Sequence, residues 1–151
     1  MGWGLALHGL SQHADSRIHF DKALTLNLDS AELLAYSAEL WLSSGNATRA
    51  LHQARASLAL QDVPATRVLI GDCLARSGDL AGGFEQYLGP LGESAAYARV
   101  GAEALRLKRF DDAIHFLQEA MRTSPSYNES LAKVLAEARE RWREQQASRQ
   151  P

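Results

Sequence analysis

The chain has 151 residues, which is enough for one domain with a hydrophobic core and too few to expect two. Its residues are 46% hydrophobic and 23% charged, the balance of an ordinary globular protein. The formal net charge of −2 offers no electrostatic basis for nucleic-acid binding, and no apolar run is long enough to span a membrane. A single cysteine, Cys73, excludes an internal disulfide and a cysteine-based metal cluster.

The first unit, residues 1–30, is an incomplete pair of amphipathic helices. Its elements are Trp3-Gly4-x2-Leu7 in the first helix and Ser16-x3-Phe20 with Ala23 in the second. The bulky residue that should open the unit would lie before Met1. We therefore expect the chain to begin partway through a helix, as a fragment of a longer protein, the end of a larger array or a shortened natural start.

The second and third units, residues 31–64 and 65–93, repeat the pattern. Their elements are Leu34-x2-Ser37-Ala38-x2-Trp41 and Ala50-x3-Ala54, then Arg67-x2-Ile70-Gly71-x2-Leu74 and Gly83-x3-Tyr87. Pro64 is expected to close the second unit, because proline lacks the backbone donor that a continuing helix needs. Gly89 and Pro90 predict a short, weak second helix in the third unit, with a local bend that is either a hinge or an irregularity.

The fourth unit, residues 94–126, has the clearest pattern, with Ser94 as the expected N-cap of its first helix. Its elements are Tyr97-x2-Val100-Gly101-x2-Ala104, then Ala113-x3-Leu117, Ala120 and Pro125. Gly101 and Ala113 are expected where the two helices approach most closely. Residues 127–146 follow as one helix with a single apolar stripe, suited to cap the last unit, and residues 147–151 as a flexible tail.

The recurrence of this pattern decides the fold class. The small packing residues Ser16, Ala50, Gly83 and Ala113 follow one another at intervals of 34, 33 and 30 residues. The pattern resembles the tetratricopeptide repeat, a helix–turn–helix unit of about 34 residues. The resemblance covers nearly the whole chain and implies an all-α solenoid of antiparallel helix pairs in a right-handed superhelix, forming a single domain over residues 1–146.

Local sequence indicates no catalytic centre, metal site or cofactor. His8 and His13 flank a predicted turn near Asp15, but their spacing is not that of metal ligands. His19, His52 and His115 are scattered over different units, and Cys73 has no base beside it. We therefore expect a protein that is not an enzyme.

The resemblance places a partner-binding groove on the concave wall made by the first helix of each unit. Mapped onto this chain, the groove residues are Leu5, His8, Glu32, Ala35, Glu39, Leu42, Val68, Asp72, Ala75, Arg76, Ala98, Ala102, Leu105 and Arg106. Some family members grip the carboxylate tail of heat-shock chaperones with Lys, Asn and Arg. The matching places here hold Ala35 and Glu39, which argues against that role.

The leading hypothesis is a non-catalytic cytoplasmic scaffold, adaptor or chaperone that binds a peptide or helix of another protein in this groove. Bacterial adaptors and secretion or pilus-assembly chaperones are family roles of this kind, and a homo-oligomer is compatible with the pattern. The alternative is an accessory domain that recruits a partner or substrate for a larger multidomain enzyme or assembly. A helical-repeat RNA binder is disfavoured by the net charge of −2 and by the scarcity of lysine.

Overall fold

A computed structural model describes residues 22, 30–126 and 128–149 of the chain. Leu5 and His8 lie outside the described residues, as does the first unit apart from Lys22 and Ser30. The described part is all-α, and its helices are α3 (Ala31–Ser43), α4 (Ala47–Leu60), α5 (Pro64–Arg76), α6 (Leu80–Leu91), α7 (Glu93–Arg106), α8 (Phe110–Thr123) and α9 (Glu129–Ala147).

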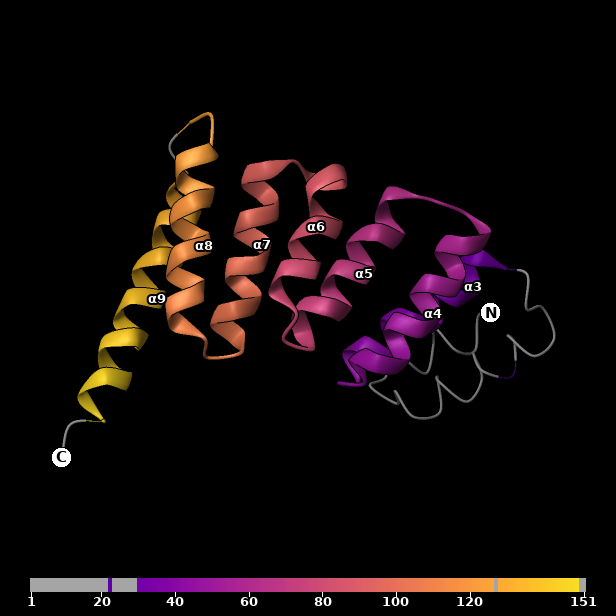
Figure 1. The fold of residues 1–151 in the computed structure, drawn as a ribbon, viewed down its shortest axis with the longest axis horizontal. Helices are drawn as coiled ribbons and strands as arrows, with labels where there is room; N and C mark the ends of the chain where they lie inside the picture. Colours follow the sequence, from indigo (N-terminus) through magenta and orange to yellow (C-terminus); the bar gives the residue numbers. More distant parts are fainter. Residues whose placement is uncertain (1–21, 23–29, 127, 150–151) are drawn as a thin grey trace.

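The helices stack side by side as an α-solenoid of antiparallel pairs, which confirms the predicted fold class (Figure 1). The pairs are α3 with α4, α5 with α6, and α7 with α8, and α9 packs against α8. The first helix of each pair also contacts the first helix of the next pair, as α3 does with α5. The described second helices, α4, α6 and α8, make no such contacts with one another. The first helices therefore form the more closely packed layer, as expected on the inner side of a curved stack.

The turn between the two helices of each described pair contains one residue with a left-handed backbone conformation. These residues are Gly45, Gly78 and Lys108, with φ of 84°, 100° and 59°. In the first two turns the next residue caps the second helix, since Asn46 accepts a hydrogen bond from the Arg49 N–H at 3.0 Å and Asp79 accepts one from the Gly82 N–H at 2.9 Å. The third turn is less favourable, because Lys108 carries a Cβ where only glycine adopts this conformation without strain.

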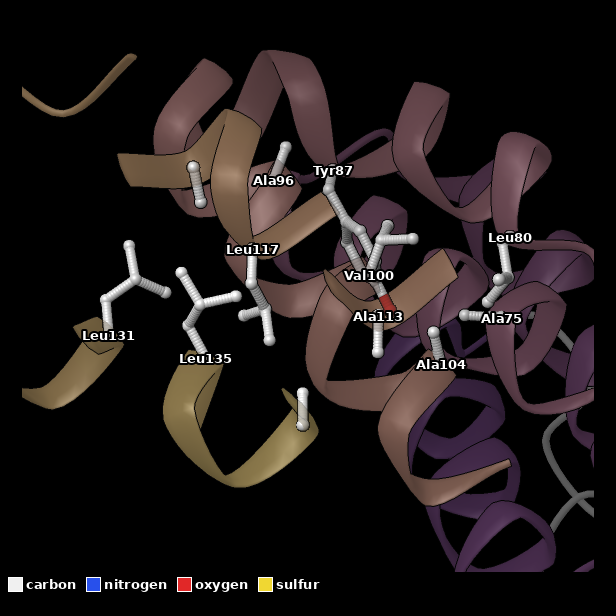
Figure 2. Close-up of a cluster of buried hydrophobic side chains, with 12 residues drawn as sticks. Ala75, Leu80, Tyr87, Ala96, Val100, Ala104, Ala113, Leu117, Leu131 and Leu135 are labelled. Carbon is white, nitrogen blue, oxygen red and sulfur yellow. The ribbon is translucent and has the colours of Figure 1, made fainter. Parts of the chain in front are cut away.

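Close approach of the paired helices depends on small residues. A Cβ at Gly101 would lie 2.7 Å from Cγ of Leu117, and one at Gly71 would lie 2.5 Å from Cε1 of Tyr87. Gly101, predicted at the close approach, lies against Leu117 of α8, and Ala113 is fully buried in the cluster that contains Leu117. Figure 2 shows how the larger side chains, including Tyr87 and Leu117, fill the space between these helices.

One of two prolines has a different role in the structure from the one that the sequence predicted. Pro64 was expected to close the second unit, but it is the first residue of α5. This position suits proline, because the first N–H of a helix has no partner within the helix and the ring fixes a helical φ. Pro90 lies inside α6, which ends one residue later and has 12 residues where α4 has 14. The predicted shortening of this helix is confirmed.

Gly92 alone joins α6 to α7, and this explains the shorter spacing of the third and fourth units. It has φ of 79° and ends one helix while preceding the next. Ser94, predicted as the N-cap of α7, is instead the second residue of that helix, and its hydroxyl donates to the Ala120 carbonyl oxygen at 2.9 Å. This bond ties α7 to α8 within one pair.

The helix α9 covers the last pair with one apolar stripe. Leu131, Leu135 and Ala138 are buried against the core of the fourth unit. The Trp142 Nε1–H donates to Asp111 Oδ1 at 2.7 Å, which anchors α9 to the first turn of α8. These contacts suit a capping helix. The single-domain range of 1–146 and the flexible tail stay predictions.

The turn at Lys108 leads to a stability prediction. Replacing Lys108 with glycine should raise the free energy of unfolding by about 0.5–1 kcal/mol, because the left-handed backbone costs an ordinary residue more than the added chain entropy costs glycine. Urea unfolding followed by circular dichroism measures the change. The matched control is Gly78→Lys, where a Cβ meets no atom within 4 Å. It should lower stability by a similar amount, and a Lys108→Gly variant no more stable than the parent would contradict the strain argument.

Candidate partner-binding wall

The structure describes all but two of the residues predicted to line the groove. Those on α3, α5 and α7 differ in exposure: Glu32, Glu39, Ala102 and Arg106 are exposed, Ala35, Val68, Arg76, Ala98 and Leu105 are half-buried, and Leu42, Asp72 and Ala75 are buried. The first-helix layer is therefore only partly open.

Leu42 and Ala75 do not lie on an open surface. Leu42 is 6% exposed and packs into the cluster of the second and third units, while Ala75 is fully buried. Both positions were chosen because they face away from the second helix of their own unit. Ala75 is nevertheless buried against Gly83 of α6, the second helix of its own unit, and Leu42 lies in a cluster with Leu69 and Ile70 of α5.

Ala98 and Ala102 do meet at an open hollow of about 820 Å³, which we call the alanine hollow. It lies among the end of α6, the length of α7, the end of α8 and the start of α9, and is lined by Leu91, Gly92, Glu93, Ser94, Ala95, Ala98, Arg99, Ala102, Thr123, Asn128 and Leu131. Small side chains along α7 leave this space, because a larger residue at Ala98 or Ala102 would fill it.

Asp72 on α5 forms hydrogen bonds with side chains of two other helices, α6 and α7. Its carboxylate accepts bonds from Arg99 on α7, from Nε at 2.8 Å and Nη2 at 2.7 Å. The Tyr87 hydroxyl of α6 donates to Asp72 Oδ1 at 2.7 Å. The Asp72 side chain is 11% exposed and that of Arg99 is 45% exposed. A nearly buried carboxylate therefore has several donors, as such a group requires.

One helical turn later, a second set of charges joins α5 to α7. Glu103 on α7 lies 3.6 Å from Arg76 Nε and 2.7 Å from Arg106 Nε, measured from Oε1 and Oε2 respectively. Asp72 and Arg76 on α5 therefore face Arg99 and Glu103 on α7, with the signs in opposite order. We call these four residues the charge ladder. It favours one register of the two helices, because a shift by one turn would bring like charges together.

The ladder includes two residues that sequence reasoning missed, Arg99 and Glu103. The sequence does carry a signal for them, since Asp72 and Arg76 are four residues apart, as are Arg99 and Glu103. That spacing puts each pair on one helix face. Which face of α7 meets α5 could not be read from the spacing alone.

Burial and hydrogen bonding perturb three groups around Asp72. Burial raises the pKa of the Tyr87 phenol above its usual range, and the bond to the Asp72 carboxylate adds to the rise. The hydrogen bonds to Asp72 raise the pKa of the Arg99 guanidinium further. Burial raises the pKa of the Cys73 thiol to about 12, with the Asp72 charge adding to it. A thiol held protonated at neutral pH is a poor nucleophile.

The described residues contain no group of three or more His, Cys, Asp or Glu side chains placed to hold a metal ion. His8, His13 and Asp15 lie outside that part of the chain. Among the described helices, none is long and apolar enough to cross a membrane.

Similar architectures occur among solved structures. A crystal structure of MamA matches with a TM-score of 0.64 and 12% identity, over 97% of this chain and 98% of that one. The C-terminal part of a TPR repeat-containing protein from Cytophaga hutchinsonii matches with a TM-score of 0.64 and 15% identity, over 94% of this chain and 58% of that one. The chain has the tetratricopeptide-repeat fold.

A third match is the APC/C hetero-tetramer Cut9–Hcn1, with a TM-score of 0.62 and 16% identity, over 89% of this chain and 28% of the matched chain. No family model matches the sequence, and no curated protein is similar to it. Because the sequence identities to these structures are low, the matches show a similar fold and nothing about shared function.

Asp72 should contribute far more to stability than an exposed carboxylate. Asp72→Ala should lower the free energy of unfolding by about 2–3 kcal/mol, because it leaves the Tyr87 hydroxyl and the Arg99 guanidinium without their acceptor. The control is Asp62→Ala, which removes an exposed pair with Arg67 and should change the free energy of unfolding far less, because solvent screens that pair. Urea unfolding measures both, and equal losses would contradict the structural role of Asp72.

Stability should fall at alkaline pH. In the unfolded chain a cysteine loses its proton near pH 8.5 and a tyrosine near pH 10, whereas folded Cys73 and Tyr87 keep theirs to higher pH. The folded state therefore binds more protons than the unfolded chain at alkaline pH. The free energy of unfolding is undiminished below about pH 8.5, and each group lowers it by about 1.4 kcal/mol per pH unit above the pKa of that group in the unfolded chain.

Urea midpoints measured from pH 7 to 11 test this prediction. Cys73→Ala should abolish the decline that begins near pH 8.5 and leave the part due to Tyr87. If Cys73→Ala and the parent decline in parallel from pH 8.5 to 10, the thiol of Cys73 does not contribute as stated.

Proposed function

We propose that this chain is a non-catalytic interaction scaffold that binds a peptide or helix of a partner protein along its first-helix wall. The observation that carries the proposal is the alanine hollow, an open space of about 820 Å³ along α7 and the start of α9. Its lining combines small apolar side chains with the single guanidinium of Arg99 and the carboxylate of Glu93. Apolar contact of this kind, with a few charges to set register, suits a helix or an extended segment.

Contacts between α5 and α7 support this proposal. The charge ladder, together with Tyr87, fixes Arg99 and α7, so that one side of the hollow is already in place before a partner binds. A preformed site loses less conformational entropy on binding. The fold adds further support, because a chain of the Cut9–Hcn1 hetero-tetramer, a protein assembly, has a similar stack of helices.

The chemistry of the described side chains also favours binding over catalysis. Cys73 is buried, and burial raises the pKa of its thiol to about 12. His52 and His115 are exposed on α4 and α8, which belong to different pairs. The cytoplasmic location and the single domain inferred from the sequence remain part of this proposal.

A capture experiment with a variant in the alanine hollow tests the proposal. Ala102 is exposed on α7, so Ala102→Arg places a long charged side chain in the hollow without disturbing the core. The parent chain should retain a partner from a lysate of the source cell, and Ala102→Arg should retain at least about tenfold less, equivalent to about 1.4 kcal/mol.

The matched control is Ala81→Arg, the same change at an exposed alanine of the second helix α6. This variant should retain the partner as the parent does, and circular dichroism should show that both variants are folded. Equal capture by Ala102→Arg and the parent would place the binding surface elsewhere, and no capture by the parent would count against the scaffold itself.

A further inference from the structure

A second, smaller hollow lies at the turn end of the first helices. It has a volume of about 190 Å³ and is lined by Leu42, Ser43, Gly45, Ala47, Arg76 and Arg106. We call it the arginine hollow. Arg76 is the last residue of α5 and Arg106 the last residue of α7, so two different units supply its cations.

The hydrogen bonds of these two arginines are far from complete. Arg106 uses its Nε to bind Glu103, and Arg76 Nε lies 3.6 Å from the same carboxylate, too far for a hydrogen bond. Arg76 Nε is buried and has no hydrogen-bond partner, yet 34% of the Arg76 side chain is exposed. Within the described residues, no hydrogen bond uses the terminal nitrogens of either guanidinium group, so these nitrogens are available to a ligand.

The local charge balance favours an anion. Two guanidinium groups share the one carboxylate of Glu103, while Asp72, the nearest carboxylate on α5, is already bound by Arg99 and Tyr87. The remaining charge at the arginine hollow is thus positive by one unit.

Three backbone oxygens at the end of α3 are already engaged in hydrogen bonds. The carbonyl oxygens of Leu40, Trp41 and Leu42 all accept hydrogen bonds within the turn. On the other side of the hollow lies Ala47, the first residue of α4, whose N–H is not needed by the helix ladder.

We propose that the arginine hollow binds the carboxylate of an acidic side chain, Asp or Glu, on the partner segment. A guanidinium presents two parallel N–H donors that match a planar carboxylate, and a carboxylate fits the small volume. This proposal rests on the proposed scaffold function and adds a charge requirement to it. The site is distinct from the positions of Ala35 and Glu39 and lies at the ends of the first helices.

The test uses the isolated, ¹⁵N-labelled chain with glutarate as a model of an acidic side chain. The Arg76 and Arg106 Nε–H signals are followed by NMR during titration at constant ionic strength. We expect these signals to shift and saturate, and we expect Arg106→Gln and Arg76→Gln each to weaken the apparent affinity by about tenfold or more. Sodium chloride at the same ionic strength should produce no such saturation.

The matched control is Arg122→Gln. Arg122 pairs with Glu119 three residues before it, as Arg106 pairs with Glu103, but it does not line this hollow. The variant should bind glutarate as the parent does. If the Nε–H signals of Arg76 and Arg106 shift linearly without saturation, and the Arg122 signal shifts equally, the effect is charge screening only and the proposal is overturned. Glutarate binding that survives Arg106→Gln would also overturn it.

A parallel titration with inorganic phosphate separates the two kinds of anion. Saturation with glutarate supports the carboxylate site, whereas saturation with phosphate alone would overturn it. This experiment needs no partner, so its failure is distinguishable from that of the scaffold function, which is read from Ala102→Arg. Glutarate binding in a chain that captures no partner would uphold the anion site and count against the scaffold.

Discussion

The close approach of two helices through residues without bulk is the constraint on which the rest of this structure depends. At Gly71 the ring of Tyr87 occupies the place that any Cβ would take, and at Gly101 the Leu117 side chain does the same. The opposing alanines, such as Ala113, are fully buried. Because helices this close bury their contact surface completely, each pair behaves as one unit, and units can then stack.

The stacking is least regular between the third and fourth units. Gly92 is the whole connection between α6 and α7, which brings these helices into contact a few residues earlier than in the preceding step. Two side-chain contacts hold the junction in addition to the charge ladder. Phe84 of α6 stacks on Tyr97 of α7 with ring centroids 4.5 Å apart, and Arg109 donates to the Gly78 carbonyl oxygen at 2.9 Å. The irregular step is thus well packed.

The wall has two kinds of surface because the first helices use two kinds of residue. Alanines along α7 leave an apolar hollow, whereas charged residues near the ends of α5 and α7 pair across the gap between units. The pairing is incomplete at the turn end, where Arg76 and Arg106 share one carboxylate. A partner that followed the first helices would meet apolar surface first and positive charge at one edge, and this sequence of contacts would set its direction.

Much of this architecture is local in origin and was predicted from the sequence. The amphipathic spacing, the turn at Gly78 and the apolar stripe of α9 depend on neighbours a few residues away, and the small residues at Gly71 and Gly101 on the adjacent helix of the same pair. A pattern that recurs in each unit therefore identified the fold class. Pro64 was misassigned because a proline suits a helix start and the residues after a helix end equally well.

The residues of the wall were only partly predictable, for a different physical reason. Which side of a first helix is open depends on how the second helix of its own unit and the helices of the next unit pack against it, and those contacts join residues far apart in the chain. Leu42 and Ala75 became core, Ala98 and Ala102 stayed open, and Arg99 and Glu103 joined a ladder that the sequence reading had not assembled. The sequence by itself determined the helices and the repeat, because these follow from local spacing. Only the tertiary structure decided which side chains of the first helices are exposed, because exposure depends on contacts between residues far apart in the chain.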